Sequence, residues 1–295
     1  MAQVVLVHGI FNYVRGATPQ EAALEAAAQC RTELAAGLAK AGLAGAADPD
    51  LAMAYYADLL RPGLPDEAQA DEEGQEEDGF EKLTARERED AAEWLVTAGA
   101  PVPEQVQNIG LAPLRQLLGW LVDDRKGPMG RRLRDRTVRR LERMMLAMLR
   151  EVEAYTTWSE RRRLVQERVA QTIQREQPKV IVAHSLGSVV AYETLHAHPE
   201  LRVRQLVTLG SPLRLPSLAR RLEPGLRAGR GARPAGVEHW TNIADVGDLV
   251  AIPPKLSEVF PVDQDEVFDN GLDFHGLGSY LANGLTGLAV VPYLS

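Results

Sequence analysis

The segment Val180–Glu193, with the sequence VIVAHSLGSVVAYE, places one serine where an apolar run meets a helical pattern. Its residues Ala183, Ser185 and Gly187 form a small-x-Ser-x-Gly pattern, which is typical of a nucleophile elbow between a strand and a helix. Strand and helix pass close together at such a corner, so both flanking positions need small residues. We predict that the Ser185 hydroxyl is a nucleophile held in backbone of positive φ. A serine that merely caps the helix is the alternative.

A serine hydroxyl needs a general base, and chain order selects one of the six histidines. In this architecture the order is nucleophile, acid, histidine. His8 and His184 flank the expected oxyanion loop and the elbow, where structural roles suffice for them. His275 follows every plausible acid and precedes an expected helix, so it is the predicted base. His196 and His198 would lie too far along the elbow helix, and His239 precedes every plausible acid.

The acid is expected just after the strand predicted at Val237–Ile243, where TNIADVGDLVAIPP contains Asp245 and Asp248. Position alone does not separate these two aspartates, and Asp245 could equally cap a turn. Whichever one bonds His275 would hold a single imidazole tautomer and offset its positive charge.

The predicted oxyanion hole consists of two backbone N–H groups. One belongs to Leu186, the residue after the nucleophile. The other belongs to the loop that follows VVLVHGIF, where Gly9 allows a tight turn. Ile10 is the expected donor in that loop, and Phe11 is the alternative.

Elements that position these residues alternate between apolar runs and helical patterns, which predicts an α/β fold with a doubly wound parallel sheet. Residues 1–60 and 177–295 are expected to form its core. The middle third contains helical patterns only, so 61–176 is expected to be an acidic loop and a helical cap near Ser185. The expected strands are Gln3–Ile10, Leu51–Tyr56, Val180–Ala183, Gln205–Leu209 and Val237–Ile243, and the expected helices are Pro19–Leu43, 84–98, 103–123, 130–155, 158–176, 186–197 and 276–288.

Two parts of the expected insertion are strongly charged. Residues 66–81 contain nine acidic residues and no basic one, which predicts a solvated loop, with docking of a basic partner or a cation as the alternative. The helix expected at 130–155 has seven arginines in its first half and an apolar seam from Val138 to Tyr155. Packing of this seam on the body is expected, and a surface for anionic lipid or a protein partner is the alternative.

The composition narrows the class of protein. The chain has 295 residues, of which 45% are hydrophobic, and a net charge of −8, so a nucleic-acid partner is not expected. Neither a transmembrane helix nor a signal peptide is expected, and the single cysteine, Cys30, excludes an internal disulfide or a cysteine-rich metal site. These features favour the cytoplasm. The chemistry expected of Ser185, His275 and an aspartate needs no metal or organic cofactor.

Five blocks resemble the α/β-hydrolase superfamily in their sequence and order: VVLVHGI, VIVAHSLGSVVAYE, LVTLGSPL, DLVAIPP and HGLGSYL. The chain is similar to bacterial lipase- and esterase-like members, including proteins labelled serine peptidases, over about residues 3–60 and 177–290. The resemblance favours Asp248 over Asp245 and supports His275. It implies a reduced hydrolase fold with a mostly parallel sheet of five or six strands and a helical cap insertion.

The resemblance also implies an activity. It predicts a serine hydrolase that cleaves a carboxylic ester through Ser185, Asp248 and His275, with a lipid-like small-molecule ester as the hypothesis for the substrate. A thioesterase or amidase with the same mechanism is one alternative. A partner-regulated interaction protein on a hydrolase scaffold is the other.

Overall fold

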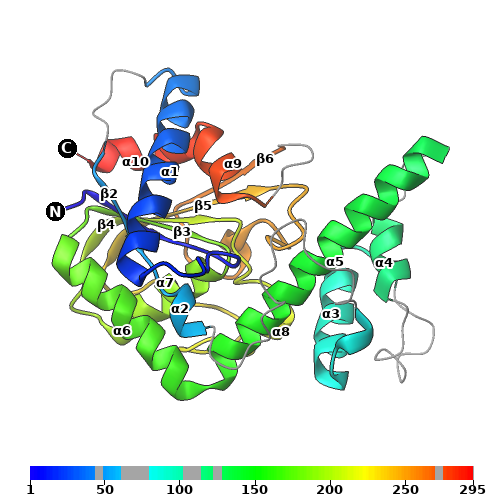
Figure 1. The fold of residues 1–295 in the computed structure, drawn as a ribbon. Helices are drawn as coiled ribbons and strands as arrows, with labels where there is room; N and C mark the ends of the chain where they lie inside the picture. The colour runs from blue at the N-terminus through cyan, green and yellow to red at the C-terminus, as the bar shows by residue number, and fades with distance from the viewer. Residues whose placement is uncertain (44–48, 61–79, 102–113, 122–127, 270–274, 295) are drawn as a thin grey trace. The chain divides into compact units, whose positions relative to one another are not determined.

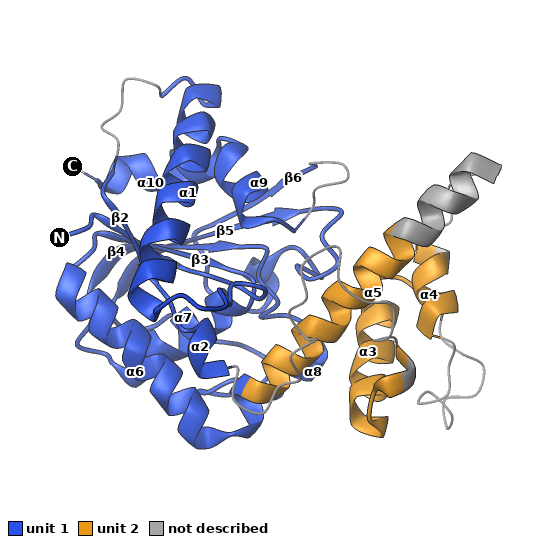
Figure 2. Cartoon of the chain, viewed as in Figure 1, with its two compact units in different colours: residues 1–62, 155–295 blue, residues 63–154 orange. Residues whose placement is uncertain are grey.

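The structure is a computed structural model that describes residues 1–43, 49–60, 80–101, 114–121, 128–269 and 275–294, without the side chains of Glu81, Trp120 and 128–136 (Figure 1). The chain divides into two compact units. Unit 1 comprises Met1–Pro62 and Tyr155–Ser295, and unit 2 comprises Gly63–Ala154 (Figure 2). The second boundary comes earlier than the sequence suggests, because the helix at Ser159–Glu176 packs with unit 1.

Unit 1 is built on a six-stranded, all-parallel sheet in the order β2-β1-β3-β4-β5-β6. The predicted parallel sheet is therefore confirmed, with one strand more than the sequence patterns indicated. That strand is β6, an edge strand with the sequence QDEVF and little burial. It lacks a continuous apolar run, so the sequence patterns do not predict it. The strands are β1 Val4–Val7, β2 Leu51–Ala54, β3 Val180–His184, β4 Val203–Leu209, β5 Val237–Asp245 and β6 Gln264–Phe268.

Helices cover both faces of the sheet (Figure 1). α1 (Pro19–Lys40), α9 (Leu277–Ala282) and α10 (Leu285–Val290) pack together on one face, while α6 (Ser159–Glu176) and α7 (Leu186–Ala197) cover the other. The single helix expected at 276–288 is divided into α9 and α10 by Gly284, whose φ of 97° cannot continue a helix. Shorter elements are α2 (Ala57–Leu60), α8 (Pro216–Ala219) and the 3₁₀ turns Leu256–Glu258 and Val291–Tyr293.

Local sequence explains where α1 begins. Thr18 precedes the helix with Pro19 in its first position, and the Thr18 hydroxyl accepts a hydrogen bond from the Glu21 N–H at 3.3 Å. The Glu21 carboxylate accepts in return from the Thr18 N–H at 2.8 Å, which completes a capping box.

At one place in the sheet of unit 1, two neighbouring strands are followed by helices on opposite faces. β1 and β3 are neighbours, yet the helix after β1 covers one face and the helix after β3 covers the other. Ligand sites in parallel α/β sheets lie outside the carboxyl ends of strands at such a switch point. The residues that follow these two ends are His8–Ile10 and Ser185.

Unit 2 is helical in its described residues, which agrees with the patterns of the middle third. It contains the 3₁₀ turn Phe80–Lys82, α3 (Ala85–Thr97), α4 (Leu114–Leu121) and most of α5 (Pro128–Thr157). The buried carboxylate of Glu142 on α5 accepts from the Phe80 N–H at 2.8 Å and from Arg115 Nε at 2.8 Å. The α5 seam is half-buried at Val138 and buried at Leu141, Met145, Met148, Val152 and Tyr155.

Several sequence predictions fall outside the described residues. These are most of the acidic loop, 66–79, the first half of the helix expected at 103–123, and the side chains of the arginines at 131, 132, 134 and 136. Within the described ranges, no helix is long and apolar enough to cross a bilayer.

Candidate active site

The corner at Ser185 has the strained backbone that the elbow pattern predicts. Its φ is 53° and its ψ is −129°, values that a non-glycine residue seldom adopts. The Ser185 N–H donates to the carbonyl of Leu209 on β4 at 2.9 Å, and the Ser185 side chain makes no capping bond to α7. Positive φ is thus confirmed, and the helix-cap alternative is wrong.

Two glycines allow the elbow to approach the end of β1. A Cβ on Gly9 would lie only 2.6 Å from the Cβ of Ser185. A Cβ on Gly187 would overlap the carbonyl oxygens of Val7 and His8. Any larger residue at either position would therefore push the β1 loop away from Ser185.

Ser185, His275 and Asp248 form a hydrogen-bonded row. The Ser185 Oγ lies 3.0 Å from His275 Nε2, and His275 Nδ1 lies 2.8 Å from Asp248 Oδ2. Because a carboxylate only accepts, Nδ1 carries the proton in neutral His275 and Nε2 is left as an acceptor for the serine hydroxyl. Asp248 is fully buried, and the His275 side chain is 11% exposed. The structure thus brings together the three residues that the resemblance favours.

Asp248 has two further donors, both uncharged. Its Oδ1 accepts from the Val250 N–H at 2.8 Å, and its Oδ2 accepts from the Tyr280 hydroxyl on α9 at 2.8 Å. The Tyr280 oxygen in turn accepts from the Asp245 N–H at 2.9 Å. Tyr280 is a site residue that the sequence patterns do not predict, because a tyrosine in an apolar helical segment is typical of a core position.

The carboxylate of Asp245 has a different role from that of Asp248. Its Oδ1 accepts from the Gly247 N–H at 2.7 Å, which is the turn-capping bond that aspartate favours. His275 Nδ1–H donates to Asp248 instead. Two residues separate the two aspartates, and only the second aspartate reaches the imidazole.

The loop after β1 is held by bonds to its carbonyl oxygens. His8 Nε2 accepts from the Tyr56 N–H at 3.1 Å, so His8 Nδ1 carries the proton and donates to the Gly9 carbonyl at 2.8 Å. Burial lowers the pKa of His8 from 6.5 to about 4, so this imidazole is neutral near pH 7. Asn12 Nδ2 donates to the carbonyls of Gly9 and Ile10 at 3.2 and 2.8 Å.

These bonds leave the expected oxyanion donors available. The C=O and N–H of a peptide unit point in opposite directions, so fixing the Gly9 carbonyl aims the Ile10 N–H to the other side of the loop. Among the described residues, neither the Ile10 N–H nor the Leu186 N–H has a hydrogen-bond acceptor. Phe11, the alternative donor, adopts a φ of 61° next to Ile10.

His184 is the second histidine beside the row. Its ring centroid lies 4.9 Å from that of His275 and 5.7 Å from that of Tyr280. Burial, together with the nearby His275, lowers the pKa of His184 well below its usual value. His184 therefore stays neutral and does not oppose a positive charge on His275.

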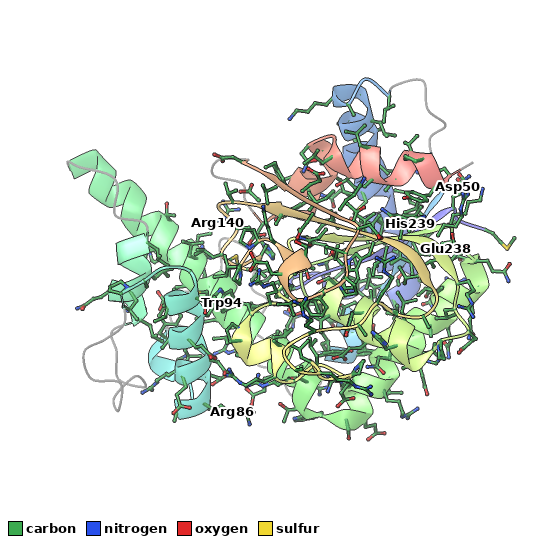
Figure 3. The ribbon with its side chains drawn as sticks, turned by 180° about the vertical axis from the view of Figure 1, so that it is seen from behind. Asp50, Arg86, Trp94, Arg140, Glu238 and His239 are labelled. Carbon is green, nitrogen blue, oxygen red and sulfur yellow. The ribbon has the colours of Figure 1, made fainter. Side chains whose placement is uncertain are left out.

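The remaining histidines lie away from the row. His239 is at the amino end of β5, where it packs on Tyr293 at 5.3 Å between ring centroids (Figure 3). Six residues of strand, about 20 Å, separate it from the carboxyl end of β5 at Asp245. His196 and His198 lie at the far end of α7. These positions agree with their elimination by chain order.

The described residues contain no group of three or more His, Cys, Asp or Glu side chains that could hold a metal ion. Cys30 is buried in α1, and burial raises the pKa of its thiol to about 11, so it is no nucleophile at neutral pH.

Comparisons of the chain with family models, with curated proteins and with solved structures give no match. The chemistry assigned to this site therefore rests on its own geometry.

Proposed function

We propose that the chain is a serine hydrolase of the α/β-hydrolase type that cleaves a carboxylic ester. The observation that carries this proposal is the row from Ser185 Oγ to His275 Nε2, at 3.0 Å, and from His275 Nδ1 to Asp248, at 2.8 Å. The positive φ of Ser185 supports it, because strained backbone at a non-glycine residue is concentrated at functional sites.

In the proposed mechanism, Ser185 Oγ attacks the carbonyl carbon of the ester while His275 Nε2 takes the hydroxyl proton. Asp248 stabilises the imidazolium that forms. The N–H groups of Ile10 and Leu186 donate to the developing oxyanion. His275 then protonates the leaving alkoxide, and the acyl group remains on Ser185.

A water molecule completes the cycle. His275 accepts a proton from this water as the water oxygen attacks the acyl carbon, and then returns that proton to Ser185 Oγ when the acid product leaves. Every proton transfer is thus made by His275, while Asp248 stays ionised throughout.

Exposed apolar side chains beside this machinery support an apolar substrate. Phe11, in the proposed oxyanion loop, is 49% exposed, and Val246, just after β5, is 57% exposed. Both follow carboxyl ends of strands, the edge at which ligands of parallel sheets bind. They favour an apolar acyl or alcohol group over a charged one, in line with a lipid-like ester.

Rates on matched substrates test the proposal and separate its alternatives. We expect the wild-type chain to hydrolyse 4-nitrophenyl octanoate faster than the octanoyl thioester and the octanoyl 4-nitroanilide. Ser185→Ala should abolish this hydrolysis, whereas Ser257→Ala, at an exposed serine, should leave it unchanged. Faster thioester or anilide turnover would indicate a thioesterase or an amidase. Absence of all three activities, or full activity in Ser185→Ala, would overturn the proposal.

A further inference from the structure

A hollow lies on the flank of unit 1, at the far end of α7 from Ser185. Its volume is about 690 Å³, within the range of small-molecule sites. His196 on α7 lines it, about 15 Å along the helix axis from Leu186. The other residues that line it come from α6, α7 and the segment 223–232, and their charged members are Glu193, Glu223, Arg227 and Arg230.

Arg227 and Arg230 in this lining face each other across a tight turn. The Arg227 N–H donates to the Arg230 carbonyl at 2.8 Å, and the Arg230 N–H donates to the Arg227 carbonyl at 3.0 Å. Directly opposed residues of an antiparallel pair project to the same side of the ribbon. The two side chains therefore leave the backbone on the same side of the turn, and both residues line the same hollow.

The turn itself places a non-glycine residue, Ala228, in backbone of positive φ. Ala228 and Gly229 both have positive φ, 49° and 75°, as a two-residue hairpin turn requires. Glycine adopts this conformation without penalty, but alanine does not. Strain of this kind is frequent in ligand clamps, where the surrounding structure holds it in place.

The segment that contains the turn is anchored at both ends. The Glu223 N–H donates to Glu193 Oε1 at 3.0 Å, and the Gly231 N–H donates to the Val259 carbonyl at 3.0 Å. His196 Nε2 lies 3.3 Å from the Ala232 carbonyl. The arginine pair is therefore presented by a fixed support and not by a free loop.

Within the part of the chain that the structure describes, no carboxylate pairs with Arg227 or Arg230. The two carboxylates of the hollow, Glu193 and Glu223, both bond to Arg162. Like charges placed directly opposite each other repel. An anion between the two guanidinium groups would remove this repulsion.

We propose that this hollow binds a small organic phosphate, with its phosphate group between Arg227 and Arg230. Guanidinium groups present paired N–H donors that match phosphate oxygens, and two of them surround a tetrahedral anion. The volume exceeds that of phosphate alone, and the half-buried ring of His196 offers surface for an aromatic or other apolar part of the ligand. The site is separate from Ser185, and the proposal does not depend on the proposed esterase activity.

Calorimetric titration of the full chain with phenyl phosphate tests the proposal. We expect saturable one-to-one binding, weaker binding of inorganic phosphate and no binding of phenol. The double variant Arg227→Gln with Arg230→Gln should bind at least about tenfold more weakly, because each lost bond to a charged group has a large effect. The double lysine variant keeps the charge but lacks the fork, and its affinity should fall between the two.

Arg140→Gln provides the matched control, because Arg140 on α5 is an exposed arginine of unit 2 that does not line the hollow (Figure 3). Its binding of phenyl phosphate should equal that of the wild type. Circular dichroism should show the double glutamine variant to be folded, since both arginines are exposed. The proposal is overturned if the wild type shows no saturable binding, if the double glutamine variant binds as well as the wild type, or if Arg140→Gln weakens binding equally.

Discussion

Asp248 and Glu193 are both completely buried carboxylates of unit 1, but their partners differ in kind. Glu193 bonds to the permanent cation Arg162, to the Tyr155 hydroxyl at 2.7 Å, to Gln166 Nε2 at 3.2 Å and to the Glu223 N–H at 3.0 Å. Asp248 bonds to two uncharged donors and to His275, whose charge can change.

This difference separates a structural carboxylate from one suited to catalysis. Burial disfavours the charged Arg162, yet its bonds to Glu193 raise the pKa of the guanidinium, so Arg162 keeps its positive charge near neutral pH. Burial and the Glu193 charge likewise raise the pKa of Tyr155 well above its usual value. Neither Arg162 nor Tyr155 therefore gives up its proton near neutral pH. Asp248 instead stabilises a histidine that can gain a proton during a reaction.

The largest effect expected from this comparison is on turnover. Asp248→Asn should lower kcat by about 10⁴-fold, because an amide N–H would face His275 Nδ1 and favour the wrong tautomer. Asp245→Asn keeps an oxygen that accepts from the Gly247 N–H, so its effect on kcat should stay below about tenfold. Steady-state rates on 4-nitrophenyl octanoate measure both. The reverse ranking would assign the role to Asp245.

Glu193→Gln should affect stability and not turnover. It removes the negative charge that compensates buried Arg162, and breaking such a pair lowers the free energy of unfolding by about 3 kcal/mol. Urea unfolding followed by circular dichroism measures this change. The kcat per folded molecule should equal that of the wild type. A large loss of kcat in a stable Glu193→Gln protein would contradict the purely structural role of Glu193.

The histidines of the site should make the protein sensitive to acid. The pKa of His8 is about 4 in the folded chain, against 6.5 when it is free. As the pH falls, His8 therefore binds a proton in the unfolded chain before it does so in the folded chain. The contribution of neutral His8 to the free energy of unfolding is fully present above pH 6.5 and is lost between pH 6.5 and 4. This loss reaches about 3 kcal/mol for His8 alone, and His184 adds to it in the same direction.

Urea midpoints measured across this pH interval test the effect. His8→Gln cannot take up the proton, so its midpoints should fall less steeply with pH than those of the wild type. Equal slopes in the two proteins would show that His8 is protonated as easily in the folded chain as in the unfolded chain.

Tyr280→Phe should have the smallest of these effects. Loss of one hydrogen bond to the Asp248 carboxylate should lower kcat about tenfold with little change in KM. Without the Tyr280 hydroxyl, more of the Asp248 charge acts on His275. The acid limb of the pH profile of kcat should then move to higher pH. A purely structural tyrosine would change stability and leave that limb in place.

Local patterns in the sequence predicted the elbow and most of the elements around it. The apolar run of β3 and the small residues beside Ser185 lie within a few positions of one another, so their geometry follows from short-range sterics. Chain order was then enough to select His275. The choice between Asp245 and Asp248 could not be made from position, because Asp245 ends β5 and Asp248 follows only three positions later.

Other features depend on contacts that local patterns do not contain. The bond from Tyr280 to Asp248 joins two elements 32 residues apart. β6 begins with three consecutive polar residues, and as an edge strand with one neighbour it is little buried, so it lacks a continuous apolar run. α6 belongs to unit 1 because its buried residues pack beside α7, a partner that an amphipathic pattern alone does not identify.

Labelling with a fluorophosphonate and mapping of the adduct by peptide mass spectrometry tests the central claim most directly. The probe reacts with a serine whose hydroxyl is activated by a base and whose oxyanion is stabilised. The account predicts a single adduct on Ser185 that is absent in Ser185→Ala, forms far more slowly in Asp248→Asn and is unchanged in Glu193→Gln. An adduct on another serine, or undiminished labelling of Ser185→Ala, would contradict it.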